Sequence, residues 1–318
     1  MPNWLLNKIR SDYEHSNPEF ALMGTINWIQ GVSLLSTHNE FSKMDFITSS
    51  DSTKKVQLTP DSENEIFESI FISLHNLSAL LVFKENSFSP ADIIKSCVTA
   101  WYDCLYYAAK AIIISKTNQI PTSFAQLEIA WLELIKNDEL IPEPFNIYLE
   151  DLTNNNIEST IKEFRKNNNN DLNSSPKDTE QAYGGVYSYL SGTAKYKAEK
   201  IRQYILDNNL KSLEFNDFRK KQAREYRDNI LANEHVSFFS CAHRYHGKVR
   251  HRDSIFMAYG KDQNTNLTTM INNLHDVAMR FYQIAATYSA ISIGNKQWNI
   301  FIADLDENSR LTIPNDLI

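Results

Sequence analysis

The residues best suited to chemistry in this chain are concentrated between positions 235 and 260. This stretch reads HVSFFSCAHRYHGKVRHRDSIFMAYG and contains four of the eight histidines. It also contains Lys248, three arginines and one carboxylate, that of Asp253. Histidine exchanges protons near neutral pH, and arginine and lysine stabilise anions. The pattern favours an anion-binding site with acid–base chemistry, and a solvated basic surface is the alternative interpretation.

Zinc binding is a second interpretation of the same stretch. Four potential ligands follow the spacing Cys241-x-His243-x2-His246-x4-His251. This spacing is not a familiar zinc pattern, and four neighbouring cations disfavour a divalent ion. The sequence also lacks a phosphate-binding glycine loop and a G-x-S-x-G nucleophile motif. We therefore expect no metal and no cofactor.

The charge of the chain is unevenly distributed. The formal net charge is −7, but residues 195–252 carry 14 Lys and Arg against 7 Asp and Glu. This part is therefore +7, and the remainder is −14. A basic segment in an acidic protein can attract a phosphate backbone locally, or it can bind an acidic surface of the same chain.

Cysteine usage and hydropathy point to a compartment. The three cysteines are Cys97, Cys104 and Cys241, an odd and widely spaced set that argues against a disulfide framework. The N-terminal residues lack the features of a signal peptide, and no apolar run reaches the length of a membrane span. We expect a soluble cytoplasmic protein without membrane association.

Low glycine and proline contents, 8 and 9 residues, favour helices over a many-turned β fold. Apolar periodicity predicts an all-α fold, and an apolar run followed by a polar turn predicts a small C-terminal β-hairpin. The predicted helices cover 3–14, 19–36, 63–84, 91–115, 123–136, 180–208, 215–231 and 265–291. The predicted strands of the hairpin cover 298–303 and 310–313.

Three regions follow from this pattern. Residues 1–62 are expected to form an N-terminal helical extension and a loop. Residues 63–292 are expected to form a helical core, interrupted at about 153–178 by an Asn-rich flexible excursion. Residues 293–318 would contain the hairpin.

Metal-free cleavage of RNA is a reaction that the basic stretch could support. The 2′-hydroxyl of RNA is a built-in nucleophile, so the protein must supply a proton acceptor and a cation that stabilises the phosphorane. Arg244 and His251 are seven positions apart, and this separation places them on one face of a helix, two turns apart. Asp253 or Tyr259 could orient the imidazole or the substrate.

These features resemble the HEPN superfamily, which comprises small all-helical domains that are often RNases in toxin–antitoxin, anti-phage and CRISPR-associated systems. Residues 96–115, SCVTAWYDCLYYAAKAIIIS, are similar to the family's helix of small and aromatic residues. Arg244-x6-His251 is similar to the family's Arg-x4–6-His signature. Two positions differ, because Tyr245 replaces the polar residue that often follows the arginine and Gly247 would weaken a continuous helix.

The resemblance implies a metal-independent endoribonuclease of a bacterial defence or toxin–antitoxin-type system that acts on RNA as a homodimer. Arg244 would stabilise the phosphate and His251 would act as base or acid, supported by His246, Asp253 and Tyr259. Residues expected to bind the RNA backbone are Lys248, Arg250, Arg252, Lys220, Lys221 and Arg224. The alternative is a catalytically inactive helical module that binds nucleic acid or a regulatory protein partner.

Overall fold

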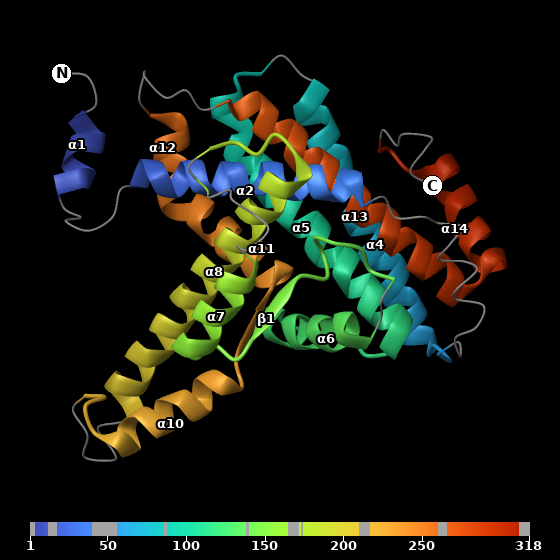
Figure 1. Ribbon diagram of the computed structural model, residues 1–318. Coiled ribbons are helices and arrows are strands. Elements are labelled where there is room, and N and C mark those ends of the chain that lie inside the picture. The colour runs from blue at the N-terminus through green and yellow to red at the C-terminus, as the bar shows by residue number, and fades with distance from the viewer. Residues whose placement is uncertain are drawn as a thin grey trace.

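The computed structural model describes residues 4–11, 18–39, 56–85, 88–137, 140–164, 172, 174–209, 217–259 and 266–311. These residues form an all-α fold with one very small sheet (Figure 1). The elements in the first half of the chain are α1 (Trp4–Ser11), α2 (Pro18–His38), α4 (Pro60–Glu85), α5 (Pro90–Thr117), α6 (Phe124–Asn137), β1 (Tyr148–Glu150) and α7 (Asn154–Phe164). Those in the second half are α8 (Thr179–Tyr204), η1 (Ile205–Asn209), α10 (Lys221–Ala232), β2 (His235–Ser237), α11 (Phe238–Lys248), η2 (Val249–Asp253), α12 (Ser254–Ala258), α13 (Leu267–Ile293) and α14 (Asn295–Asn308).

Helix α5 lies at the centre of the molecule and packs against both α4 and α13 (Figure 1). Proline at its first position suits a helix start, because the missing N–H would have no partner there. The helix ends at Asn118, which adopts a left-handed conformation (φ 59°) and donates its backbone N–H to the carbonyl of Ile114 (2.9 Å). Fifteen residues of α5 are buried, which confirms the prediction of a central apolar helix over 91–115.

Helix α2 belongs to the same core, although the sequence suggested an N-terminal extension. Trp28 is buried and stacks on Tyr189 of α8, with ring centroids 4.4 Å apart. The Trp28 ring also meets Trp101 of α5 edge-on at 6.1 Å and Tyr245 of α11 at 5.8 Å. This aromatic cluster joins four helices, so a boundary at residue 62 does not separate α2 from the core.

The Asn-rich segment is anchored on both sides. Phe164, the last residue of α7, stacks on Tyr187 of α8 at 3.9 Å. Further along, the Ser175 hydroxyl donates to the side-chain oxygen of Asn27 (2.9 Å), and Gln30 donates to the Pro176 carbonyl (3.0 Å). Residues 165–171 and 173 lie outside the described residues, and there the predicted flexible excursion stays a prediction.

The two short strands pair far from the predicted hairpin. β1 and β2 are antiparallel, with Tyr148 opposite Ser237 and Glu150 opposite His235. β2 leads directly into α11, so this small sheet fixes the start of the helix that carries the basic stretch.

The predicted C-terminal hairpin is wrong where the structure describes it. Residues 298–303 lie inside helix α14, and residues 312 and 313 of the second predicted strand lie outside the described residues. Phe301 faces the core and contacts the ring of Phe67 on α4 at 4.8 Å. The run contains Trp298, Phe301, Ile302 and Leu305, which is helical spacing.

One expectation about hydropathy also needs correction. Helix α4 is long and apolar enough to cross a membrane by length and composition, with a mean hydropathy of 1.7 in its most apolar window. It nevertheless packs against α5 and α13, and Ile66, Ile70, Leu74 and Leu77 are buried there. A core helix of a soluble protein passes the same test, so this finding is weak support for a membrane span.

Candidate functional site

The basic stretch forms helix α11 and the π-helical turn η2 that continues it. At the start of α11, Ser237 and Ser240 form a reciprocal capping box, in which the Ser237 N–H donates to the Ser240 side-chain oxygen (2.9 Å). The helix runs through Gly247 without a break, contrary to the weakening that glycine suggested. The wider turn of η2 then carries His251, and such π-helical turns occur frequently at functional sites.

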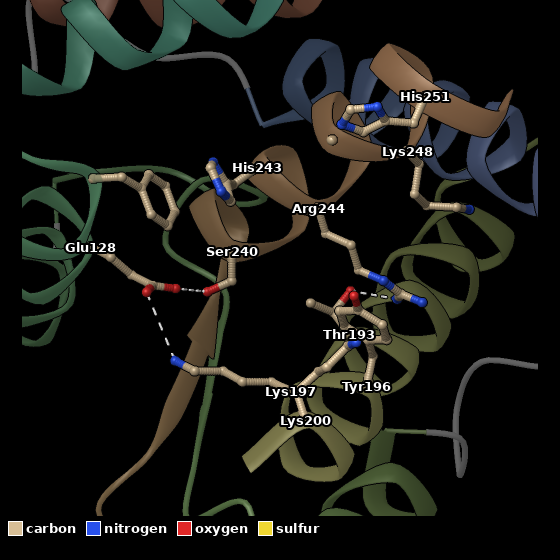
Figure 2. A pocket seen from close by; sticks show the side chains of 12 residues that line it. Glu128, Thr193, Tyr196, Lys197, Lys200, Ser240, His243, Arg244, Lys248 and His251 are labelled. Carbon is tan, nitrogen blue, oxygen red and sulfur yellow. Dashed lines mark hydrogen bonds and ion pairs between the residues drawn. The ribbon is translucent and has the colours of Figure 1, made fainter. Parts of the chain in front are cut away.

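A pocket of about 620 Å³ opens beside α11 (Figure 2). Helices α6, α8 and α11 and the turn η2 supply its walls. The lining residues are Phe124, Glu128, Thr193, Tyr196, Lys197, Lys200, Ser240, His243, Arg244, Gly247, Lys248 and His251. The structure therefore brings Arg244, Lys248 and His251, three residues singled out from the sequence, to one cavity.

Arg244 is held by helix α8. Its Nη1 donates to the Thr193 hydroxyl (3.1 Å), and its guanidinium lies over the Tyr196 ring, 4.8 Å from the centroid. The ring of Tyr189 lies on the buried side of the guanidinium at 5.7 Å. The guanidinium is therefore fixed by a hydrogen bond and by aromatic faces, which stabilise a cation.

His251 lies at a different part of the pocket and is exposed to solvent. Figure 2 shows Arg244 directed toward Thr193 and Tyr196, whereas the His251 ring lies beyond the base of Lys248. Within the described part of the chain, no hydrogen bond or ring contact joins Arg244 to His251. Between them lies Gly247, where a Cβ would meet nothing within 4 Å, so the floor of the pocket is open there.

His243 is a second histidine in the pocket. Its Nδ1 lies 2.8 Å from the Tyr102 hydroxyl of α5, and its ring stacks on Phe124 of α6 with centroids 3.9 Å apart. His243 keeps an exposed face, but desolvation of the part packed against the protein lowers its pKa, and the negative charge of Glu128 acts in the opposite direction. The net lowering favours the neutral imidazole.

The acidic side of the pocket is already neutralised. The carboxylate of Glu128 accepts a hydrogen bond from Ser240 and lies 3.8 Å from the Lys197 ammonium. Lys197 also donates to the His235 carbonyl (2.8 Å) and pairs with Glu234 at 3.1 Å. Among the lining residues, the cations Lys197, Lys200, Arg244 and Lys248 outnumber the single carboxylate, that of Glu128, so the pocket as a whole attracts anions.

Two of the proposed supporting residues are buried beside the pocket but do not line it. His246 stacks on Tyr102 at 4.4 Å, and its pKa is lowered to about 4 by burial, by the charge of Arg250 and by His243. Asp253 is 3% exposed and lies 3.5 Å from the Lys248 ammonium. Asp253 can therefore position Lys248, whereas His246 supports the ring of Tyr102.

The other predicted residues lie elsewhere. Tyr259 and Arg250 are exposed and do not line the pocket. The side chain of Arg252 lies outside the described part of the structure. Lys220, Lys221 and Arg224 are exposed at the start of α10, which projects beyond the end of α8, away from the central helices (Figure 1).

Several pocket residues could not be selected from the sequence. Phe124 and Glu128 come from α6, and Thr193, Tyr196, Lys197 and Lys200 come from α8. The α8 residues do lie at spacings of three and four, so they share one helical face. Their meeting with α11 depends on tertiary packing that no short-range pattern encodes.

No protein-family model, curated protein or solved structure matches this chain. The resemblance to the HEPN superfamily therefore rests on its two sequence features alone.

Proposed function

We propose that this protein is a metal-independent endoribonuclease that cleaves RNA through the 2′-hydroxyl, in the cytoplasm, as part of a bacterial defence or toxin–antitoxin-type system. The observation that supports this proposal is the shared pocket of Arg244 and His251. A proton carrier and a fixed guanidinium facing one anion-attracting cavity are the groups that this reaction needs.

The chemistry assigns a task to each group. Attack of the 2′-oxygen on phosphorus places negative charge on the phosphorane oxygens, and the planar guanidinium of Arg244 donates to those oxygens. His251 moves a proton in the same step. Lys248 and Lys200 contact the neighbouring phosphates, since both line the pocket. Because RNA supplies the nucleophile, DNA is not a substrate.

Two further parts of the proposal rest on the resemblance. In HEPN proteins two protomers commonly place their motifs together, so we propose a homodimer. A regulatory protein partner is proposed as well. The pocket described above is formed within one chain, and a second copy would extend the surface that holds RNA.

Cleavage of labelled RNA by the purified protein tests the function. The wild-type protein is expected to produce 2′,3′-cyclic phosphate ends on RNA, to leave DNA intact and to keep its rate in EDTA. His251→Ala is expected to lose about 10²–10⁴-fold in rate, as for loss of a general acid or base. Arg244→Lys is expected to lose about 10²–10³-fold, because an ammonium cannot reproduce the planar donor pair.

Matched controls are available on distant elements. His75→Ala and Arg310→Lys change exposed residues that do not line the pocket, and they are expected to cleave at the wild-type rate. If His251→Ala cleaves as fast as the wild type, the activity comes from another site or from a contaminant, and the proposal is wrong.

A non-catalytic RNA-binding module is the second candidate. The observation that favours it is the divergence of the two side chains, since Arg244 is directed toward Thr193 and His251 lies elsewhere in the pocket (Figure 2). Binding needs only accessible cations, whereas cleavage needs both groups at one phosphate. RNA binding that weakens with salt, without cleavage of several RNAs by the wild-type protein, would identify this function.

A further inference from the structure

We propose that His243 is the general base of the reaction and that His251 is the general acid. This assignment rests on the proposed function and adds a catalytic group to it. Cleavage by transesterification needs one group to accept the proton of the 2′-hydroxyl and another to protonate the departing 5′-oxygen. A single histidine cannot stand on both sides of the phosphorus atom in the same step.

The placement of the two histidines fits this division. Both line the pocket, and His243 precedes Arg244 directly in α11, whereas His251 lies on η2. Figure 2 shows the two imidazole rings apart from each other, with Arg244 leaving the helix between them. The two imidazoles therefore flank the point where the Arg244 side chain leaves α11, whereas its guanidinium is directed toward Thr193 and Tyr196. The proposal places the phosphate between the imidazoles, with the guanidinium turned toward it.

Contacts from two other helices hold the His243 ring. The Tyr102 hydroxyl lies 2.8 Å from Nδ1, and Phe124 covers one face of the ring at an interplanar angle of 18°. With Nδ1 occupied, Nε2 is the nitrogen that remains for the substrate. Tyr102 is itself fixed by stacking on His246 at 4.4 Å. A histidine that acts as a general base is commonly oriented in this way, by a hydrogen bond to the ring nitrogen that does not take up the proton.

The surroundings of His243 favour the form that accepts a proton. Burial lowers its pKa, and the charge of Glu128 acts in the opposite direction. The cations that line the same pocket are Lys197, Lys200, Arg244 and Lys248. His246 lies one turn further along α11. The pKa of Tyr102 is raised, mainly by burial and also by Tyr106, Asp103 and Glu128. The Tyr102 hydroxyl therefore stays protonated and can accept a hydrogen bond from Nδ1–H while Nε2 takes up a proton.

The step balances with these two groups. The bond from the 2′-oxygen to phosphorus forms as the bond from phosphorus to the 5′-oxygen breaks. The proton of the 2′-hydroxyl moves to Nε2 of His243, and a proton from His251 moves to the 5′-oxygen. The products are a 2′,3′-cyclic phosphate and a 5′-hydroxyl, and exchange with water restores both imidazoles.

An RNA with sulfur in place of the scissile 5′-oxygen separates the two roles, because a thiolate departs without protonation. On ordinary RNA, His243→Asn and His251→Ala are both expected to lose about 10²–10⁴-fold in rate. On the sulfur substrate, His251→Ala is expected to approach the wild-type rate, whereas His243→Asn remains slow. Asparagine retains a group that can hydrogen-bond to Tyr102 but cannot carry a proton near neutral pH.

Each outcome decides the assignment. If His243→Asn cleaves ordinary RNA at the wild-type rate, the inference is wrong and the proposed function survives. If the sulfur substrate rescues His243→Asn instead of His251→Ala, the roles are reversed and the assignment is wrong. If the wild-type protein cleaves neither substrate, the proposed function fails and the inference fails with it.

Tyr102→Phe is the second variant, in case His243→Asn does not fold. It removes only the hydroxyl and keeps the ring that stacks on His246. The expected result is a kcat about tenfold lower with an unchanged KM, since the imidazole loses its orientation but the phosphate contacts remain. An unchanged kcat on ordinary RNA would contradict the role given to the His243–Tyr102 pair.

Discussion

Arg244 and His243 are adjacent in the chain, and different partners fix each of them. Arg244 is held by Thr193 and the Tyr196 ring on α8, whereas His243 is held by Tyr102 on α5 and by Phe124 on α6. Both side chains are therefore ordered by contacts within the protein. If they act as proposed, this order reduces the reorganisation that the reaction requires.

His246 gives a prediction about stability and pH. Its pKa is lowered from 6.5 to about 4 in the folded protein, mainly by burial. The unfolded chain therefore binds a proton more tightly, and the free energy of unfolding falls as the pH decreases below 6.5 and levels off below about 4. The loss is expected to reach about 3 kcal/mol, at 1.36 kcal/mol for each unit of pKa.

Chemical denaturation of His246→Phe at several pH values measures this effect. Phenylalanine keeps a ring against Tyr102 and removes the titrating group, so the variant is expected to lose less stability than the wild type between pH 7 and 4.5. His75→Phe, at an exposed position of α4, serves as the control and is expected to keep the wild-type slope. Identical slopes for His246→Phe and the wild type would contradict the lowered pKa.

Predictability from the sequence differed between residues of the same pocket. Arg244, Lys248 and His251 could be selected because they lie within eight positions, where helical periodicity relates them directly. The Glu128 carboxylate could not be selected, since it meets Ser240 across 112 positions of the chain. The catalytic roles themselves stay predictions that the cleavage experiments address.

At the scale of elements, helix α10 gives a test of RNA binding. Lys220, Lys221 and Arg224 are exposed at its start, away from the pocket (Figure 1). We expect these cations to contact the backbone of an RNA that extends beyond the pocket. Their replacement by glutamate should weaken binding of all sequences alike, reduce the slope of log affinity against log salt by about 2 and leave kcat unchanged.

Binding measured at several salt concentrations checks this prediction. A variant with Lys95, Lys296 and Arg310 replaced by glutamate has the same change in charge at exposed positions outside α10. That control is expected to keep the wild-type slope. Equal losses in the two variants would mean that net charge, and not α10, determines the affinity.

The elements themselves were predictable to different degrees. The long helix α5 was predicted well because its start has Ser89 and Pro90 and its apolar residues extend over several turns. Residues 298–303 were predicted as a strand because a run of only six mixed apolar and polar residues fits both the two-residue period of a strand and the 3.6-residue period of a helix. In the helical conformation Phe301 contacts Phe67 of α4, a tertiary contact that the local sequence does not show.

At the scale of the whole molecule, the N-terminal region and the pocket share one core. Trp28 of α2 contacts Tyr189 of α8 and Tyr245 of α11. The Tyr189 ring lies beside the Arg244 guanidinium, and Tyr245 follows Arg244 in the chain. The sequence could not show this, since an apolar segment of 18 residues does not indicate which helices cover it. The N-terminal region is therefore expected to be required for stability.

Trp28→Ala tests whether α2 is part of the core. Trp28 is 1% exposed and packs among four other aromatic rings, so its removal is expected to lower the free energy of unfolding by about 3–5 kcal/mol. Trp4→Ala is the matched control in the same region, because Trp4 is 58% exposed on α1. That change is expected to stay within about 0.5 kcal/mol of the wild type. Urea denaturation followed by circular dichroism measures both, and a loss for Trp28→Ala as small as that for Trp4→Ala would contradict the place of α2 in the core.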